Sequence, residues 1–287
     1  MNLRASPMST GKKISPSCVE IRTESEMIEF EYAHDGAVAF VTLARPPANA
    51  FTVDGLCQLR EVIEAFNREA KVRAIVITGS GPKFFSAGAD LNAFATGDRE
   101  VARTAASAFG AAFETLQNAR PVVIAAINGY AMGGGLECAL ACDIRIAEAH
   151  AQLALPEPAV GLLPCGCGTQ TLPWLVGEGW AKRIILTGER VDAATALRIG
   201  LVEEVVEQGG ARAAALAMAA RVATLSPQAV SFSKALIHQA RNGVPRGAAL
   251  AVERERFVDL FDSPNQREGV NAFLEKRKPH WHIEMEN

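Results

Sequence analysis

Residues 121–142 read PVVIAAINGYAMGGGLECALAC and contain, in order, an apolar run, three consecutive glycines and an apolar helical segment. The run 121–127 has the length and composition of a buried β-strand. Gly133, Gly134 and Gly135 stand directly before the helix, whose free N–H groups and positive dipole end converge at this point. The turn is therefore predicted to face an anion or a polarised carbonyl oxygen. Taken alone, the glycines could equally serve close packing of strand against helix.

A second glycine turn lies upstream, in KFFSAGADL at residues 83–91. It follows another strand-like run, RAIVIT at 73–78, and Gly88 lets the backbone beyond it approach a ligand closely. Two such turns can direct two backbone N–H groups at one oxygen atom, which is the arrangement of an oxyanion hole.

The same alternation of strand and helix extends in both directions from these turns. Residues 27–32 and 37–43 predict a β-hairpin around Asp35-Gly36, followed by a rigid loop at 45–50 and a helix ending near Lys71. A strand at 73–78 is followed by a helix at 100–116, and a strand at 121–127 is followed by a helix that begins at Gly134. After residue 169 the pattern is helical apart from a strand at 202–206. The expected helices there are 180–187, 192–199, 212–225, 227–241 and 247–261. The pattern predicts an α/β fold.

Composition restricts the function classes. The chain has 287 residues, of which 49% are hydrophobic and 21% charged, and a net charge of -3. No global basic field favours nucleic acid or an anionic membrane, and no apolar stretch reaches the roughly 20 residues of a membrane span. The six cysteines are scattered, and neither they nor the histidines show metal-ligand spacing. A reducing compartment is expected: the cytoplasm, or the mitochondrial matrix in a eukaryote. Residues 1–26 are predicted to be a disordered extension.

Two carboxylates accompany the glycine turns. Glu137 falls in the first helical turn after the glycines, and Glu157 lies in LPEP, residues 155–158, before another glycine-bearing loop. A carboxyl group in apolar surroundings has a raised pKa, and two that share a site push each other's pKa values apart. One can then donate a proton while the other accepts one. The alternative is that Glu137 only stabilises a helix N-terminus and Glu157 is a surface loop residue.

These motifs, together with residues 156–170, resemble the enoyl-CoA hydratase/isomerase (crotonase) superfamily over about residues 27–281. The resemblance implies a crotonase-like spiral of ββα units over residues 27–225 and a helical C-terminal region, 226–287, that assembles trimers or hexamers. It implies an acyl-CoA thioester as substrate, with coenzyme A as part of that substrate and no separate cofactor.

Four positions match the reacting centre of the family. Ala89 and Gly134 match the two backbone donors to the thioester carbonyl, and Glu137 and Glu157 match the catalytic glutamates of the hydratases. The resemblance therefore implies hydration of 2-enoyl-CoA to 3-hydroxyacyl-CoA. An enoyl-CoA isomerase or a dehydratase of a functionalised acyl-CoA is the alternative among enzymes, and a non-catalytic RNA-binding or scaffolding relative is the alternative outside them.

Further positions match family contacts to coenzyme A. By resemblance, the contacts near the pantetheine are Ala48 and Asn49, and those near the adenine are Ala87, Asp90 and Leu91. The contacts from the C-terminal region, often of a neighbouring subunit, are Phe257, Phe273 and Lys276. Lys276 fits equally well as part of a solvated helix face. The walls of the acyl pocket are expected at residues 92–96 and 257–261.

One position departs from the family pattern. Residues 164–169 read PCGCGT where hydratases commonly read PGAGGT, so Cys165 replaces a glycine whose N–H helps to position the attacking water. The Cβ atom of a cysteine restricts the backbone dihedrals. Either the local geometry suits a cysteine, or the water site differs.

Overall fold

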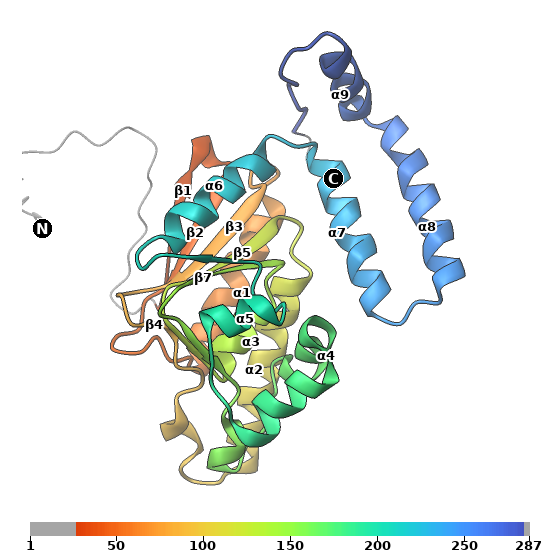
Figure 1. Cartoon of the computed structure of the whole chain (residues 1–287). Helices are drawn as coiled ribbons and strands as arrows, with labels where there is room; N and C mark the ends of the chain where they lie inside the picture. The colour runs from red at the N-terminus through yellow and green to blue at the C-terminus, as the bar shows by residue number, and fades with distance from the viewer. Residues whose placement is uncertain (1–26, 284–287) are drawn as a thin grey trace, which may run out of the picture.

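The computed structural model describes residues 27–283, so the predicted disorder of residues 1–26 lies outside the described residues. A six-stranded mixed sheet forms the centre of the molecule (Figure 1). Its strands, in spatial order, are β1 (Ile28–Ala33), β2 (Val38–Leu43), β3 (Ala74–Gly79), β5 (Val122–Ile127), β7 (Ile144–Glu148) and β10 (Glu204–Val206). The β1–β2 pair is the predicted antiparallel hairpin, with Ile28 opposite Leu43, and the other pairs are parallel.

A smaller mixed sheet lies next to the first. Its strands, in spatial order, are β4 (Phe84–Ser86), β6 (Tyr130–Met132), β8 (Gln152–Ala154) and β9 (Val191–Asp192). The strands β3, β5 and β7 of the large sheet are each followed in the chain by a short strand of the small sheet and then by a helix. This repetition is the expected spiral of ββα units. The short strands have only two or three residues, which is too few to show a period in the sequence.

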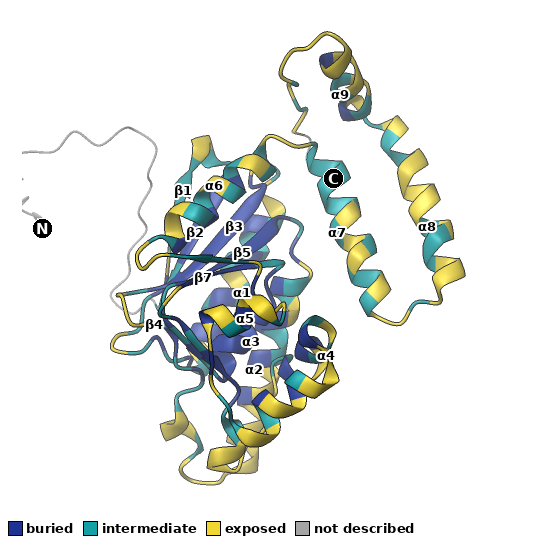
Figure 2. Cartoon of the chain, viewed as in Figure 1, coloured by how far each residue is buried: buried dark blue, intermediate teal, exposed yellow. Residues whose placement is uncertain are grey.

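Helices cover both faces of the large sheet. Their bounds are α1 (Val53–Arg68), α2 (Arg99–Gln117), α3 (Gly134–Leu140), α4 (Gly168–Thr187), α5 (Ala193–Arg198) and α6 (Ala211–Ala223). Because side chains alternate along a strand, Val38 and Phe40 pack with α6, whereas Ala39 and Val41 belong to the core formed with α1 and α2. Figure 2 shows that the buried residues concentrate in these layers.

Helix α4 begins earlier than predicted. The sequence pattern indicates a helix from residue 180, but the structure has it from Gly168. Pro173 lies inside the helix, and Gly177 interrupts it with a φ of 77°. Both residue types normally end helices, so the sequence pattern does not indicate the first half of α4. This earlier start matters because the residues just before and at the start of α4 contact Glu137, as described below.

The C-terminal helices stand to one side of the sheets (Figure 1). They are α7 (Pro227–Arg241), α8 (Arg246–Asp259) and α9 (Pro264–Leu274). Lys234 attaches α7 to the core, because its ammonium lies 2.6 Å from the Asp143 carboxylate and donates to the Pro121 carbonyl at 2.9 Å. Large apolar side chains are exposed to solvent on α8, on α9 and on the 3₁₀ turn between them, η4 (Leu260–Asp262), among them Phe257, Phe273 and Phe261.

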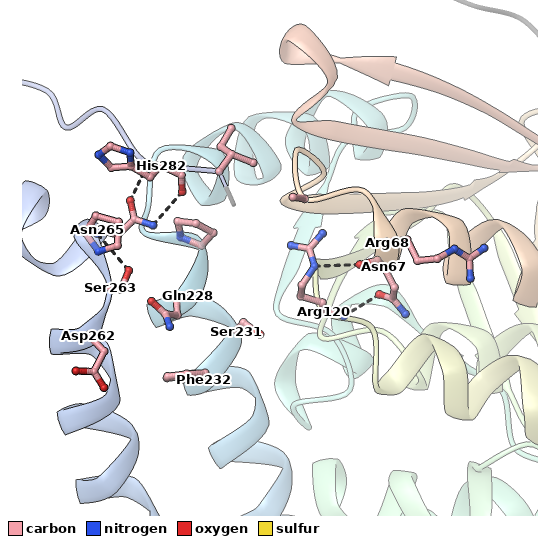
Figure 3. Close-up of a pocket in the computed structure, with 14 residues that line it drawn as sticks. Asn67, Arg68, Arg120, Gln228, Ser231, Phe232, Asp262, Ser263, Asn265 and His282 are labelled. Atoms are coloured by element: carbon pink, nitrogen blue, oxygen red, sulfur yellow. Dashed lines mark hydrogen bonds between the residues drawn. The ribbon is translucent and has the colours of Figure 1, made fainter. Parts of the chain in front are cut away.

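A cleft of ≈ 630 Å³, lined by both polar and apolar residues, separates these helices from the core (Figure 3). Arg120 lies on the core side, where its backbone N–H donates to Asn67, and Gln228 lies on the α7 side. Asn265 closes the far end through two hydrogen bonds with the backbone of His282. Over residues 27–283, no helix is long and apolar enough to cross a membrane.

Candidate active site

The two predicted glycine turns lie against each other. A Cβ atom on Gly88 would lie 2.7 Å from the Met132 carbonyl oxygen and 3.0 Å from the Gly134 nitrogen. Gly88 also has a φ of +90°, in the region that favours glycine. Only glycine therefore permits this approach, and the structure brings together the turns that lie far apart in the sequence.

The N–H group of Ala89 is turned toward the site by its neighbour Phe51. Phe51 donates to the Gly88 carbonyl at 2.7 Å and accepts from Asp90 at 2.9 Å, forming a parallel bridge with Ala89. In parallel pairing these bonds use the groups on either side of the bridged residue, so the N–H group of Ala89 points the opposite way. Ala89 lines a cavity on that side.

Gly134 provides the second free N–H group. It is the first residue of α3, and the N–H groups of a first helical turn have no acceptor within the helix. Among the described residues, neither this N–H group nor that of Ala89 has a hydrogen-bond acceptor. Gly134 lines the same cavity, so both predicted donors reach one space.

Glu137 is held rigidly at the inner end of the cavity. The residue is 2% exposed, and its Oε1 atom accepts backbone N–H bonds from Gly166 (2.9 Å), Cys167 (2.9 Å) and Gly168 (2.8 Å). A Cβ atom on Gly168 would lie 3.1 Å from Oε1, so the loop fits closely around the carboxylate. Three donors on one oxygen suit an ionised carboxylate, which only accepts.

Glu157 lies in a contrasting environment. It is the first residue of the 3₁₀ turn η3 (Glu157–Val160), and its two carboxyl oxygens are buried without a hydrogen-bond partner among the described residues. Burial raises the pKa of Glu157 to about 7, the charge of Glu137 adds to the rise, and its own backbone N–H opposes it. The structure therefore places both predicted glutamates in one cavity, in different environments.

The remainder of the cavity is apolar. Its volume is ≈ 610 Å³, and its apolar walls come from α2, the 3₁₀ turn η2 (Leu91–Phe94) and the loop after Glu157. These wall residues are Ala102, Ala105, Ala106, Phe109, Leu91, Phe94, Val160, Leu162 and Leu163. Of the expected walls, residues 92–96 contribute Phe94, whereas residues 257–261 do not line the cavity of this chain and stay a prediction. Residues 102, 105, 106 and 109 are spaced so that they share one face of a helix. This spacing is the feature of the sequence that could have indicated the apolar face of α2.

The predicted contacts to coenzyme A from the two loops fall into two groups. Ala87 and Leu91 line the cavity, and the Ala87 N–H donates to the Ala48 carbonyl at 2.9 Å. Asp90 pairs with Arg45 at 2.6 Å; the Asn92 backbone N–H and then this guanidinium lower the pKa of Asp90. Asn49 is buried, with its side-chain amide donating to backbone carbonyls, including that of Phe84 at 2.9 Å, so its side chain supports the loop.

The predicted C-terminal contacts lie elsewhere. Phe257 is on α8, Phe273 is on α9 and Lys276 follows α9, and all three are exposed. None of them lines the cavity of this chain. Their contact with coenzyme A stays a prediction, and it requires the same region of a neighbouring subunit.

Cys165 lies on the cavity wall without strain. Within residues 27–283, the non-glycine residues with positive φ are His34, Asp35, Asn49 and Lys276, so the backbone at Cys165 suits a cysteine. Burial, with the charges of Glu137 and Glu157, raises the pKa of the Cys165 thiol to about 11. The thiol is therefore neutral at physiological pH, which argues against a nucleophilic role.

Comparison with known proteins places this site in a family. The chain belongs to the enoyl-CoA hydratase/isomerase family, whose model matches residues 33–284. It is 39% identical over 245 residues to a short-chain-enoyl-CoA hydratase of Clostridium acetobutylicum, covering 85% of this chain and 94% of that protein. The fold is therefore the α/β crotonase fold.

Two solved structures are similar over nearly their whole length. The structure of Pseudomonas aeruginosa DspI is 58% identical, with a TM-score of 0.85, covering 96% of this chain and 100% of that one. The enoyl-CoA hydratase of Bacillus anthracis is 37% identical, with a TM-score of 0.87, covering 90% of this chain and 100% of that one.

Proposed function

We propose that the protein is an enoyl-CoA hydratase that adds water to 2-enoyl-CoA thioesters and forms 3-hydroxyacyl-CoA. The observation that carries this proposal is the pair of carboxyl groups in contrasting environments beside two free backbone N–H groups. The hydratase names of the relatives from Clostridium acetobutylicum and Bacillus anthracis support it.

The N–H groups of Ala89 and Gly134 bind the thioester carbonyl oxygen in this proposal. Hydrogen bonds to this oxygen withdraw electron density from the conjugated double bond, so the β-carbon becomes electrophilic. Negative charge develops on the oxygen as water adds, and donors that are already oriented stabilise that charge. The cavity's apolar walls hold the hydrocarbon part of the acyl group.

The two glutamates divide the proton transfers. Glu137, ionised within its three N–H donors, takes a proton from water while the water oxygen bonds to the β-carbon. Glu157, protonated because of its raised pKa, gives its proton to the α-carbon. One proton thus enters the pair and one leaves, and transfer of a proton from Glu137 to Glu157 through solvent restores the starting state.

Homotrimers or homohexamers are part of the proposal. The exposed aromatic side chains of α8 and α9 support assembly, because an apolar surface of this kind is typical of a subunit interface. Such an assembly could also bring Phe257, Phe273 and Lys276 to the coenzyme A of a neighbouring subunit.

A substrate panel tests the function. With crotonyl-CoA and longer 2-enoyl-CoA esters, we expect loss of the absorbance of the conjugated thioester and a product heavier by one water. A product of unchanged mass would indicate an isomerase instead. No reaction across the panel, together with tight RNA binding, would overturn the enzymatic assignment in favour of a binding protein.

The pH profile should show the titration of the glutamate pair. Hydration consumes no net proton, so both directions require the pair to carry one proton. Above a pH of about 7, Glu157 loses its proton, and we expect kcat/KM to fall about tenfold per pH unit in hydration and in dehydration alike. Initial rates between pH 5 and 9 at constant ionic strength would measure this, and a flat profile from pH 6 to 9 would contradict it.

A further inference from the structure

Three phenylalanine rings form a buried cluster beside the cavity, and one of them, Phe109, is part of the cavity wall. Phe51, Phe109 and Phe113 meet edge to face, with ring centroids 6.0 Å (51–109), 5.9 Å (51–113) and 5.6 Å (109–113) apart. Phe51 and Phe109 are 4% exposed and Phe113 is fully buried. Phe51 precedes α1, whereas Phe109 and Phe113 lie one turn apart on α2, so the cluster joins two distant parts of the chain.

Two of these rings pack closely against glycines of the site. A Cβ atom on Gly134 would lie 2.7 Å from Cε1 of Phe109, so this ring packs directly on the backbone that carries the second donor. A Cβ atom on Gly166 would lie 2.5 Å from Cδ2 of Phe113. Gly166 is one of the three residues whose N–H groups hold Glu137.

The third ring belongs to the residue that orients the first donor. The backbone of Phe51 bonds to the residues on both sides of Ala89 and thereby sets the direction of the Ala89 N–H group. Each ring of the cluster is therefore tied to a different functional segment: Phe51 to Ala89, Phe109 to Gly134 and Phe113 to the loop around Glu137.

We propose that the Phe51–Phe109–Phe113 cluster is a positioning element that fixes the two N–H donors and the Glu137 carboxylate relative to one another. This inference rests on the proposed function. Aromatic rings are rigid and the interior is close-packed, so a change of contact at one ring is transmitted to the others. Glycine has no side chain to hold it in place, so Gly134 and Gly166 depend on the rings behind them.

The effect on catalysis follows from the tight geometry that the donors require. Displacement of a catalytic group by about 1 Å can cost roughly 100-fold in rate. A smaller side chain at position 109 or 113 leaves space into which the adjoining glycine can move. We therefore expect a loss in kcat for both positions. KM should change little for Phe113, which does not line the cavity, whereas Phe109 also forms part of the cavity wall, so its variant is expected to change KM as well.

The chain provides a matched control cluster. Phe30, Tyr32 and Phe66 also meet edge to face, with centroids between 5.4 and 5.9 Å apart, and Phe66 is 1% exposed. These rings pack between β1 and α1, and none of them lines the cavity. Phe66→Leu therefore measures what the loss of a buried ring costs the fold alone.

The experiment compares Phe109→Leu, Phe113→Leu and Phe66→Leu in the full chain. We expect similar decreases in Tm for all three, but a loss of about 10-fold or more in kcat only for the first two, with KM within about 3-fold for Phe113→Leu, whose ring does not line the cavity. Phe109→Leu should also shift the infrared carbonyl stretch of a bound thioester toward its value in water, because the Gly134 N–H group moves away.

The outcomes separate this inference from the proposed function. Equal kcat values for all three variants, with an unshifted carbonyl stretch for Phe109→Leu, would reduce the cluster to ordinary core packing. If the wild type hydrates no enoyl-CoA, the proposed function fails, but the infrared comparison with bound butyryl-CoA still tests the positioning of Gly134. If a leucine variant fails to fold, Phe109→Met and Phe113→Met, whose flexible side chains fill irregular gaps, give the same comparison.

Discussion

Glu137→Gln is expected to lower kcat for hydration by about 10²–10⁴-fold, the range for loss of a positioned base. The glutamine carbonyl oxygen can still accept the N–H bonds of Gly166, Cys167 and Gly168, so the loop should keep its position. The amide cannot take a proton from water. Steady-state kinetics with crotonyl-CoA would show the loss in kcat, with KM nearly unchanged.

The matched control for this variant is Glu61→Gln, which neutralises an exposed carboxylate on α1. It should leave kcat and KM at the wild-type values. If Glu137→Gln kept more than about a tenth of the wild-type kcat, Glu137 would not be the base, and its buried carboxylate would serve only to hold the loop.

Glu157→Gln is expected to lower kcat by a similar factor, about 10²–10⁴-fold, and to raise the stability of the fold at high pH. The pKa of Glu157 rises from an ordinary 4.5 to about 7 on folding, so the folded state binds more protons than the unfolded state between these values. The free energy of unfolding therefore falls as the pH rises from about 4.5 through 7. Glutamine remains neutral and avoids this loss.

Thermal unfolding at two pH values measures the stability effect. Glu157→Gln should raise Tm at pH 8, where the wild-type carboxyl group is ionised, and change it little at pH 4, where that group is protonated in both states. Active sites commonly trade stability for function in this way. The quantity to compare is the Tm of the variant minus the Tm of the wild type. If this difference were smaller at pH 8 than at pH 4, the ionised form of Glu157 would not be unfavourable in the folded state.

Local sequence patterns predicted the features that depend on neighbouring residues. The β1–β2 hairpin follows from alternation around Asp35-Gly36, and the glycines at 88 and 133–135 predict turns that approach a ligand closely. The proximity of these turns could also be predicted, because both follow parallel strands of one sheet. The sequence pattern also singled out Glu137 and Glu157 beside these turns, and the family resemblance matched them to catalytic glutamates.

Other features depend on tertiary packing and could not be predicted from local patterns. The strands of the small sheet exist because they pair with one another, and the α2 face that lines the cavity is selected by the position of the glycine turns. The loop around Glu137 shows the same dependence. The sequence shows only a glycine-bearing loop there, and the structure shows three N–H groups directed at one carboxylate oxygen.

The three bonds to Oε1 of Glu137 also have a stereochemical consequence. With that oxygen fully occupied, the carboxylate cannot rotate, and only Oε2 is available to a water molecule in the cavity. In the proposed mechanism, the carbonyl oxygen of the substrate is held between Ala89 and Gly134, so the planar double bond would present one face to that water. Water therefore arrives from a single side, and the carbon that receives the hydroxyl group should acquire a single handedness.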